Sequence, residues 1–244
     1  MNLIIDIGNT SAKLAVFQNN KIIVSRCIQV SMLVLEIDKL LLEFTDISQG
    51  IISCVGMLPS KDIKLIQKKI SLIFLNHDLK LPFKMRYETP KTLGSDRLAL
   101  VAAGCIKYES KNVLIIDAGS CITYDFVDKN KNYFGGAIAP GINMRYNSLS
   151  HFTSNIPLLS KKITQNFIGN STESCIHSGV IKGVLHEIEG AISDYKNKYP
   201  DLTVILTGGD TDFLCKQLKI SIFANSDFLL EGLNFLLEIN SNQL

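Results

Sequence analysis

Two short segments of the sequence place an aspartate, a glycine and small polar residues directly after an apolar run. They are Leu3-Ile4-Ile5-Asp6-Ile7-Gly8-Asn9-Thr10 and Leu114-Ile115-Ile116-Asp117-Ala118-Gly119-Ser120-Cys121-Ile122-Thr123. Each run has the length of a buried strand and enters a tight turn. A glycine in such a turn lets backbone N–H groups approach an anion, and the aspartate can hold a hydrated cation. Both turns therefore predict a phosphate ligand accompanied by a metal ion.

These turns and one later segment supply the candidate residues for a nucleotide. The metal candidates are Asp6 and Asp117, and the phosphate candidates are Asp6, Gly8, Asn9, Thr10, Lys13, Gly119, Ser120 and Thr123. The later segment, Thr207-Gly208-Gly209-Asp210, ends a buried strand and precedes a helix. The amides of Gly208 and Gly209 can therefore face the phosphates, sugar or base of the nucleotide. An ordinary turn between a strand and a helix has the same pattern, so this segment alone is a weak signal.

The similarity between the two halves continues beyond the turns. An offset of 111 residues, from Asp6 to Asp117, also places Leu14–Lys21 over Asp125–Asn132. Both segments have the pattern of a strand that enters a polar turn and returns as a second strand. A repeat of about half the chain predicts two related domains, residues 1–110 and 111–244, that face each other across a cleft. The alternative is coincidence, since the pattern of a strand followed by Asp-x-Gly is common.

Gly94-Ser95-Asp96-Arg97 places an acid and a permanent cation at the start of a helix rich in small residues. Asp96 is a candidate helix cap. It is also a candidate general base that takes the proton of a substrate hydroxyl attacking a terminal phosphate, with Arg97 binding an anionic group. Phosphoryl transfer requires a positioned phosphate, charge neutralisation and such a base.

The rest of the sequence predicts alternating strands and helices, which is typical of an α/β fold with mixed sheets. The expected strands after the first hairpin are 50–54, 72–75, 113–117, 122–127, 133–138, 202–206 and 220–223. The expected helices are 32–44, capped by Ser31, and 60–70, 95–108, 172–198 and 229–239. Residues 82–93, with Pro82 and Pro90, are expected to be irregular.

The composition excludes several classes of protein. With 25 Lys and Arg against 23 Asp and Glu, the formal charge is +2, which does not indicate nucleic-acid binding. The six cysteines form no C-x-x-C pair and the four histidines form no cluster, so reduced thiols and no zinc site are expected. We expect no signal peptide, because the first residues lack a basic region and Asp6 interrupts the first apolar run, and no membrane span, because no run of about 18 apolar residues occurs. We therefore expect a cytoplasmic protein that binds neither membrane nor nucleic acid.

Taken in order, these motifs resemble the type III pantothenate kinases, which are part of a superfamily with sugar and acetate kinases, actin and heat-shock chaperones. The resemblance spans nearly the whole chain. Beyond the four motifs above, it includes Tyr87 with Pro90, Gly135-Gly136, Pro140-Gly141, Asn170-Ser171-Thr172-Glu173, Ser178-Gly179 and Glu231-Gly232-Leu233. Ser120 stands where the family usually has threonine, and the hydroxyl is kept.

The resemblance implies two similar actin-like, ribonuclease H-like domains, each with a mixed sheet that opens with a β-hairpin and is flanked by helices. It implies ATP-dependent phosphorylation of pantothenate to 4′-phosphopantothenate, the first step of coenzyme A biosynthesis. It further implies a homodimer that uses Mg²⁺ and a monovalent cation, K⁺ or NH₄⁺. By matching position, Asp96 would be the general base. The residues implied for the pantothenate pocket are Tyr87, Gly94, Ser95, Arg97 and Thr172, the last from the partner subunit.

Two other functions remain open at this point. The chain could be an actin-like nucleotide-dependent switch or a transcription accessory protein without metabolite kinase activity, although a switch has no need for a base such as Asp96. It could also phosphorylate a sugar or a short carboxylic acid, since the fold permits many acceptors. The P-loop pattern and the glycine-rich loop of protein kinases are both absent from the sequence.

Overall fold

A computed structural model describes residues 1–8, 11–56 and 58–241. The contacts within the chain group it into two compact units. Unit 1 comprises Met1–Glu109, Lys131–Tyr133 and Asp227–Leu244, and unit 2 comprises Ser110–Asn130 and Phe134–Ser226. These units do not coincide throughout with the expected domains 1–110 and 111–244, because the C-terminal helix is grouped with unit 1. The domain division itself stays a prediction.

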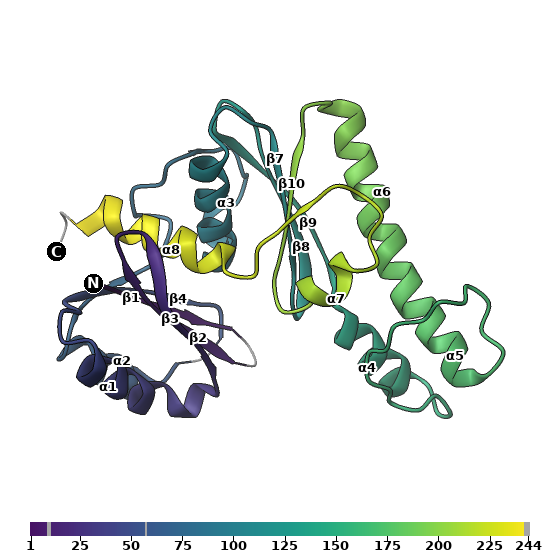
Figure 1. The fold of residues 1–244 in the computed structure, drawn as a ribbon, viewed down its shortest axis with the longest axis horizontal. Helices are drawn as coiled ribbons and strands as arrows, with labels where there is room; N and C mark the ends of the chain where they lie inside the picture. Colours follow the sequence, from purple (N-terminus) through teal and green to yellow (C-terminus); the bar gives the residue numbers. More distant parts are fainter. Residues whose placement is uncertain (9–10, 57, 242–244) are drawn as a thin grey trace. The chain divides into compact units, whose positions relative to one another are not determined.

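Unit 1 is built on a five-stranded mixed sheet with the strand order β3-β2-β1-β4-β5 (Figure 1). The strands are β1 (Asn2–Ile7), β2 (Ala12–Gln18), β3 (Lys21–Ile28), β4 (Gln49–Cys54) and β5 (Ser71–Phe74). The first three strands are antiparallel, and β1, β4 and β5 are parallel. Asn19 and Asn20 have φ angles of 50° and 61°, which asparagine tolerates well, and they form the predicted turn between β2 and β3.

Helices cover both faces of this sheet. The helices are α1 (Leu33–Glu43), α2 (Ser60–Gln67), α3 (Ser95–Lys107) and α8 (Phe228–Asn240), with 3₁₀ turns at Val30–Met32 and Pro90–Thr92. Leu3, Ile5 and Ile7 of β1 pack in one core with α1 and α2. Side chains alternate along a strand, so Ile4 points to the opposite face, where α8 contacts β1 and β4. Unit 1 therefore has three layers.

The contact between α3 and α8 is close. A Cβ atom on Gly232 of α8 would lie 2.0 Å from the carbonyl oxygen of Ala99 in α3. Only glycine therefore lets the two backbones approach in this way, and Figure 1 shows α8 running beside α3. The short strand β6 (Lys84–Met85) pairs with Asn132 and Tyr133.

Unit 2 repeats the strand order of unit 1. Its strands are β7 (Val113–Ala118), β8 (Cys121–Val127), β9 (Asn132–Pro140), β10 (Thr203–Thr207) and β11 (Phe223–Ala224). They lie in the order β9-β8-β7-β10-β11, with β7 and β8 antiparallel and β7, β10 and β11 parallel. The equal order of the two mixed sheets confirms the predicted α/β fold with an internal repeat.

The register of the repeat differs slightly from the predicted offset of 111 residues. Asp6 pairs with Lys13 in the first hairpin, whereas Asp117 pairs with Thr123 in the second. The first turn is therefore one residue longer, and the offset falls to 110 on the second strand. The prediction that Leu14 matches Asp125 is wrong by one residue, because Leu14 and Tyr124 hold the equivalent places beside Ile5 and Ile116.

The helices of unit 2 are less regular than predicted. They are α4 (Ile142–Phe152), α5 (Thr172–His177), α6 (Gly183–Lys198) and α7 (Thr211–Cys215). The single helix expected over 172–198 contains a π-helical segment, Ser178–Lys182, between α5 and α6. The sequence analysis did not predict α4. Ser31 does not cap α1, since it lies inside the 3₁₀ turn and no side-chain cap is present at Met32. Among the described residues, no helix has both the length and the apolarity that crossing a membrane requires.

Candidate active site

Asp6 lies at the carboxyl end of β1, between Lys13 of β2 and Ser53 of β4. Its side chain is half-buried, and Oδ1 is fully buried without a hydrogen-bond partner among the described residues. A buried carboxylate oxygen normally has a partner, because leaving it without one costs free energy. The buried Oδ1 of Asp6 has no such partner in the described part of the chain, so it is free to bind a cation or a hydrated ligand.

Asp96 lies in the first turn of α3, after the N-cap residue Gly94. Its Oδ1 accepts a hydrogen bond of 2.8 Å from the backbone N–H of Arg97. A Cβ atom on Gly94 would lie 2.4 Å from the same Oδ1, so glycine is needed to leave room for the carboxylate. The Ser95 hydroxyl lies 3.0 Å from the hydroxyl of Ser53, which joins the helix to β4 beside Asp6.

The negative charge of Asp96 acts on the carboxyl group of Asp6. The pKa of Asp6 is raised from 3.8 to about 6, first by burial and then by the negative charge of Asp96. A hydrogen bond from Ser53 and the charge of Lys13 act in the opposite direction. Burial also raises the pKa of Asp96, against the hydrogen bond and the charge of Arg97. Unit 1 therefore brings together two of the predicted acids, and this pair favours a bound cation or a shared proton.

The residues around Asp6 suit a magnesium ion that keeps most of its water. No group of three His, Cys, Asp or Glu that could hold a metal occurs within residues 1–8, 11–56 and 58–241. Magnesium is commonly bound by one or two carboxylates together with water and substrate phosphates, so it does not need such a group. The buried Oδ1 of Asp6 fits this mode of binding.

Arg97 and Tyr87 also lie together. Arg97 is only 6% exposed, and its guanidinium carbon lies 5.8 Å from the centre of the Tyr87 ring. Tyr87 in turn stacks on Tyr133, with ring centres 6.1 Å apart. A cation over an aromatic face is held in a fixed orientation. Arg97 and Tyr87, both predicted to bind the substrate, therefore lie in contact with each other.

A pocket of about 380 Å³ opens beside the start of α3. Gly94 and Ser95 line it, as do Cys54 at the end of β4 and His77 and Lys91 from the following segments. The sequence analysis missed these last three residues, and it also missed Ser53. Ser53 could have been found, because a parallel neighbour of β1 that ends in a polar residue places that residue beside Asp6.

In unit 2, Asp117 lies between Thr123 of β8 and Thr207 of β10, at the carboxyl end of β7. The hydroxyl of Thr123 is buried and has no hydrogen-bond partner among the described residues. An orphaned hydroxyl beside a carboxylate suits a phosphate oxygen or a cation.

Gly208 and Asp210 place the turn after β10 in contact with the turn after β7. Gly208 has a φ angle of +96°, and a Cβ atom on it would lie 2.3 Å from Oδ1 of Asp117. The backbone N–H of Asp210 donates a 2.9 Å hydrogen bond to the carbonyl of Ala118. The turns after β7 and β10 therefore form one double turn, with its backbone close to Asp117. The carboxylate of Asp210, 6% exposed, forms an ion pair with Lys161.

The turn after β7 is held by backbone hydrogen bonds. The N–H of Gly119 donates to the carbonyl of Cys121 at 2.9 Å, and the N–H of Gly141 donates to the carbonyl of Ser120 at 3.2 Å. A Cβ atom on Gly141 would lie 2.3 Å from the carbonyl oxygen of Gly119. The predicted motif Pro140-Gly141 therefore supports the phosphate turn.

Four predicted residues contribute less to this picture. Asn9 and Thr10 lie outside the described residues. The backbone N–H of Gly8 donates a 3.0 Å hydrogen bond to the carbonyl of Ser11, between the first two strands. Thr172 is exposed at the first residue of α5, so its place in an acceptor pocket stays a prediction.

Comparison with known proteins assigns the family. The family model for type III pantothenate kinase matches residues 2–194. The chain belongs to the type III pantothenate kinase family. A type III pantothenate kinase from Christiangramia forsetii is 50% identical over the full length of both chains. Another from Flavobacterium johnsoniae is 42% identical over 96% of each chain, and one from Bacteroides fragilis is 39% identical over both full lengths.

Solved structures agree with this family at the level of the fold. A structure described as a conserved Baf family transcriptional activator from Campylobacter jejuni has a TM-score of 0.65 and 21% identity, with 98% of this chain and 99% of that chain covered. A ROK family glucokinase from Streptomyces griseus, in complex with glucose and AMPPNP, has a TM-score of 0.54 and 11% identity, with coverages of 96% and 98%. These neighbours place the family in the actin-like fold.

Proposed function

We propose that this chain transfers the terminal phosphoryl group of ATP to the primary hydroxyl of pantothenate, giving 4′-phosphopantothenate and ADP. Membership of the family supports the reaction. The observation that supports the assignment of residues is the pairing of Asp96 with Asp6 at the start of α3, where both have raised pKa values. The proposed reaction is the first step of coenzyme A biosynthesis.

Asp96 is the general base in this proposal. Its carboxylate takes the proton of the attacking hydroxyl, while the hydroxyl oxygen forms a bond to the terminal phosphorus and ADP leaves with the electrons of the broken bond. Burial raises the pKa of Asp96 and makes it a stronger base than an exposed aspartate. The hydrogen bond from the Arg97 N–H fixes one carboxylate oxygen, which leaves the other to face the acceptor. Arg97 and Tyr87 would bind the carboxylate end of pantothenate.

Asp6 and Asp117 would hold the cations that accompany the triphosphate. Asp6 would bind hydrated Mg²⁺ through its orphaned Oδ1, which neutralises phosphate charge when the metal is bound. Asp117, with the hydroxyl of Thr123 beside it, would hold a phosphate or a monovalent cation, K⁺ or NH₄⁺. The double turn with Gly208 and Gly209 would face the nucleotide.

We also infer a homodimer formed through unit 2. The end of α4 and the segment that leads from it into α5 leave large apolar side chains uncovered. These are Phe152, Leu158, Phe167 and Ile168, which are 81%, 63%, 70% and 79% exposed. A group of large exposed apolar side chains is typical of a surface that binds another protein, and we infer that a second copy of the chain binds here. Analytical ultracentrifugation that finds only monomer at micromolar concentration would contradict this inference.

The alternative functions are less well supported. Relatives that share up to 50% identity over the full chain carry the name type III pantothenate kinase, which does not favour a switch without kinase activity. Structural similarity to a glucokinase at 11% identity supports the fold alone, so it does not favour a sugar acceptor.

The substitution Asp96→Asn tests the assignment of the base. The amide keeps the size of the side chain and cannot accept the proton, so turnover of pantothenate with ATP and Mg²⁺ should fall by at least about 10²-fold. The melting temperature should stay near that of the wild type. Gly94→Ala is a second variant, because its Cβ would displace the same carboxylate. Normal turnover in Asp96→Asn would refute the role of Asp96, and a wild-type enzyme inactive on pantothenate would refute the substrate.

A further inference from the structure

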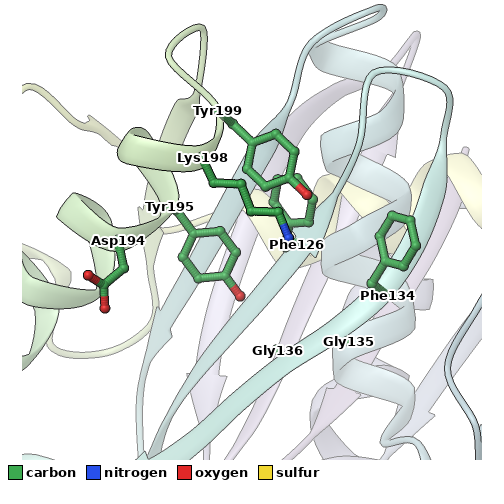
Figure 2. A pocket seen from close by; sticks show the side chains of 8 residues that line it. All are labelled: Phe126, Phe134, Gly135, Gly136, Asp194, Tyr195, Lys198 and Tyr199. Atoms are coloured by element: carbon green, nitrogen blue, oxygen red, sulfur yellow. The ribbon is translucent and has the colours of Figure 1, made fainter.

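A second pocket lies in unit 2, between the C-terminal end of α6 and strands β8 and β9 (Figure 2). It has a volume of about 530 Å³, which is within the usual range for small-molecule sites. Its walls are aromatic. Phe126 and Phe134 come from the two strands, Tyr195 comes from α6, and Tyr199 directly follows that helix.

The rings form a partly open cluster. The Phe126 ring stacks on Tyr199 with centres 4.4 Å apart, and it lies 5.3 Å from the centre of Tyr195. Phe134 is nearly parallel to Phe126, at 6.4 Å and an angle of 21°. Phe134 nevertheless remains 53% exposed. An aromatic face is therefore left uncovered, opposite the two tyrosines.

The floor of the pocket has no side chains, because Gly135 and Gly136 form it. Gly135 has a φ angle of 97°, which disfavours other residues. A Cβ atom on Gly136 would lie 1.7 Å from the carbonyl oxygen of Tyr124. The Gly135-Gly136 pair stood out in the sequence, and phosphoryl transfer as described above does not use it. In the structure, it gives a flat floor beside the exposed ring of Phe134.

The pocket is lined by one cation, Lys198, and one acid, Asp194, and the cation is the one that faces the rings. In Figure 2 the ammonium group of Lys198 points inward among the rings, whereas the carboxylate of Asp194 points away from them. The Lys198 Nζ lies 5.6 Å from the centre of the Tyr199 ring. Burial and the charge of Asp125 raise the pKa of Tyr195, so its hydroxyl remains a hydrogen-bond donor. An anion in the pocket would meet one cation and at least one donor.

This pocket is separate from the phosphate turn of the same unit. Phe126 of β8 pairs with Leu114 of β7, three residues before Asp117 on that strand. The phosphate turn follows the carboxyl end of β7, so the aromatic pocket lies toward the opposite end of the sheet. A ligand there would not occupy the position proposed for the triphosphate.

We propose that this pocket binds a planar aromatic ring that carries a negative charge. The ring would lie over the glycine floor, between Phe134 and the tyrosines, and Lys198 would pair with the negative group. Aromatic pockets can also bind cations through their ring faces, but here a cation would be repelled by Lys198. An anionic ligand is therefore favoured. The proposal is independent of the function assigned to Asp96.

Titration calorimetry with three probes tests the proposal on the full-length protein. The probes are 1-naphthoate, 1-naphthylmethylamine, which has the same ring with the opposite charge, and 5′-AMP. We expect 1-naphthoate to bind with a stoichiometry of one and 1-naphthylmethylamine to bind at least about tenfold more weakly. Phe134→Ala should weaken binding of 1-naphthoate about tenfold through lost stacking, and Lys198→Gln should weaken it about threefold.

Both substituted side chains are exposed, so the variants should fold normally. Phe223→Ala is the matched control, since it removes an exposed phenylalanine of unit 2 that lies neither in the pocket nor in the surface proposed for the dimer. AMP binding that Phe134→Ala weakens would identify a nucleotide as the ligand, and binding of 1-naphthoate alone would identify an aromatic carboxylate. The proposal is overturned if neither anion binds, if the amine binds as tightly as the carboxylate, or if both variants bind like the wild type.

Discussion

The raised pKa of Asp6 predicts that the substitution Asp6→Asn stabilises the protein while it abolishes activity. An aspartate with a raised pKa holds its proton more tightly in the folded protein than in the unfolded chain. Folding must therefore pay a penalty at each pH above the unfolded pKa of 3.8, and the penalty is complete above about 6. The difference between these values corresponds to about 3 kcal/mol.

The substitution removes this penalty, so its benefit should depend on pH. Near pH 5 part of the wild type still carries the proton, and the gain in the free energy of unfolding should be about half of its value at high pH. At pH 8 the gain should be about 3 kcal/mol. For a chain of this size, the increase in melting temperature should then be about 3–6 °C larger at pH 8 than at pH 5.

Thermal unfolding without nucleotide or divalent metal, followed by circular dichroism at pH 5, 6, 7 and 8, measures this difference. Asp46→Asn is the matched control, because Asp46 is an exposed aspartate of unit 1. The control should change the melting temperature little at any of these pH values. If Asp6→Asn were less stable than the wild type at pH 8, or if its gain did not depend on pH, the electrostatic strain inferred at Asp6 would be refuted.

Two further predictions concern the double turn of unit 2. Gly208→Ala should weaken ATP binding, measured by calorimetry, and cost about 1–2 kcal/mol in stability, because of its positive φ angle and the contact with Asp117. Gly190→Ala is its control, since Gly190 lies in α6 outside the double turn and a Cβ atom there would meet no described atom within 4 Å, and equal effects of the two variants would contradict the reasoning. Lys161→Met should leave the buried carboxylate of Asp210 without its ion pair and cost about 2–4 kcal/mol. The further change Asp210→Asn should restore most of that loss in urea unfolding, and no restoration would show that the ion pair is unimportant.

The sequence was most informative where a local pattern determines the structure. An apolar run followed by Asp-x-Gly predicted the ends of β1 and β7, and Asn19-Asn20 predicted the turn between β2 and β3. Alternating apolar residues in the strands and a helical period in α3 gave their positions within a few residues. Gly94 and Asp96 were found as a pair, although the reason that Gly94 must be glycine is visible only in three dimensions.

The missed features depend on contacts between distant segments. Ser53 is polar and buried, and its relation to Asp6 follows from the parallel pairing of β4 with β1. Helix α4 was also missed, and only Ile142 and Tyr146 within it are buried. The buried hydroxyl of Tyr146 lies 2.7 Å from Nδ1 of His177, a contact that no local pattern predicts. The π-helical segment begins at the next residue, Ser178, where the apolar spacing still suggested a continuous helix.

The place of α8 has a consequence for how the chain is made. A helix from the far end of the sequence packs on β1, β4 and α3, the oldest part of the nascent chain. While the ribosome is still translating unit 2, the apolar side chain of Ile4 and the surface around Ala99 lack the helix that later covers them. Unit 1 therefore cannot finish folding in the order of its synthesis. Its final consolidation waits until residues 228–240 have left the exit tunnel, and a stalled or truncated product would expose this surface to chaperones and proteases.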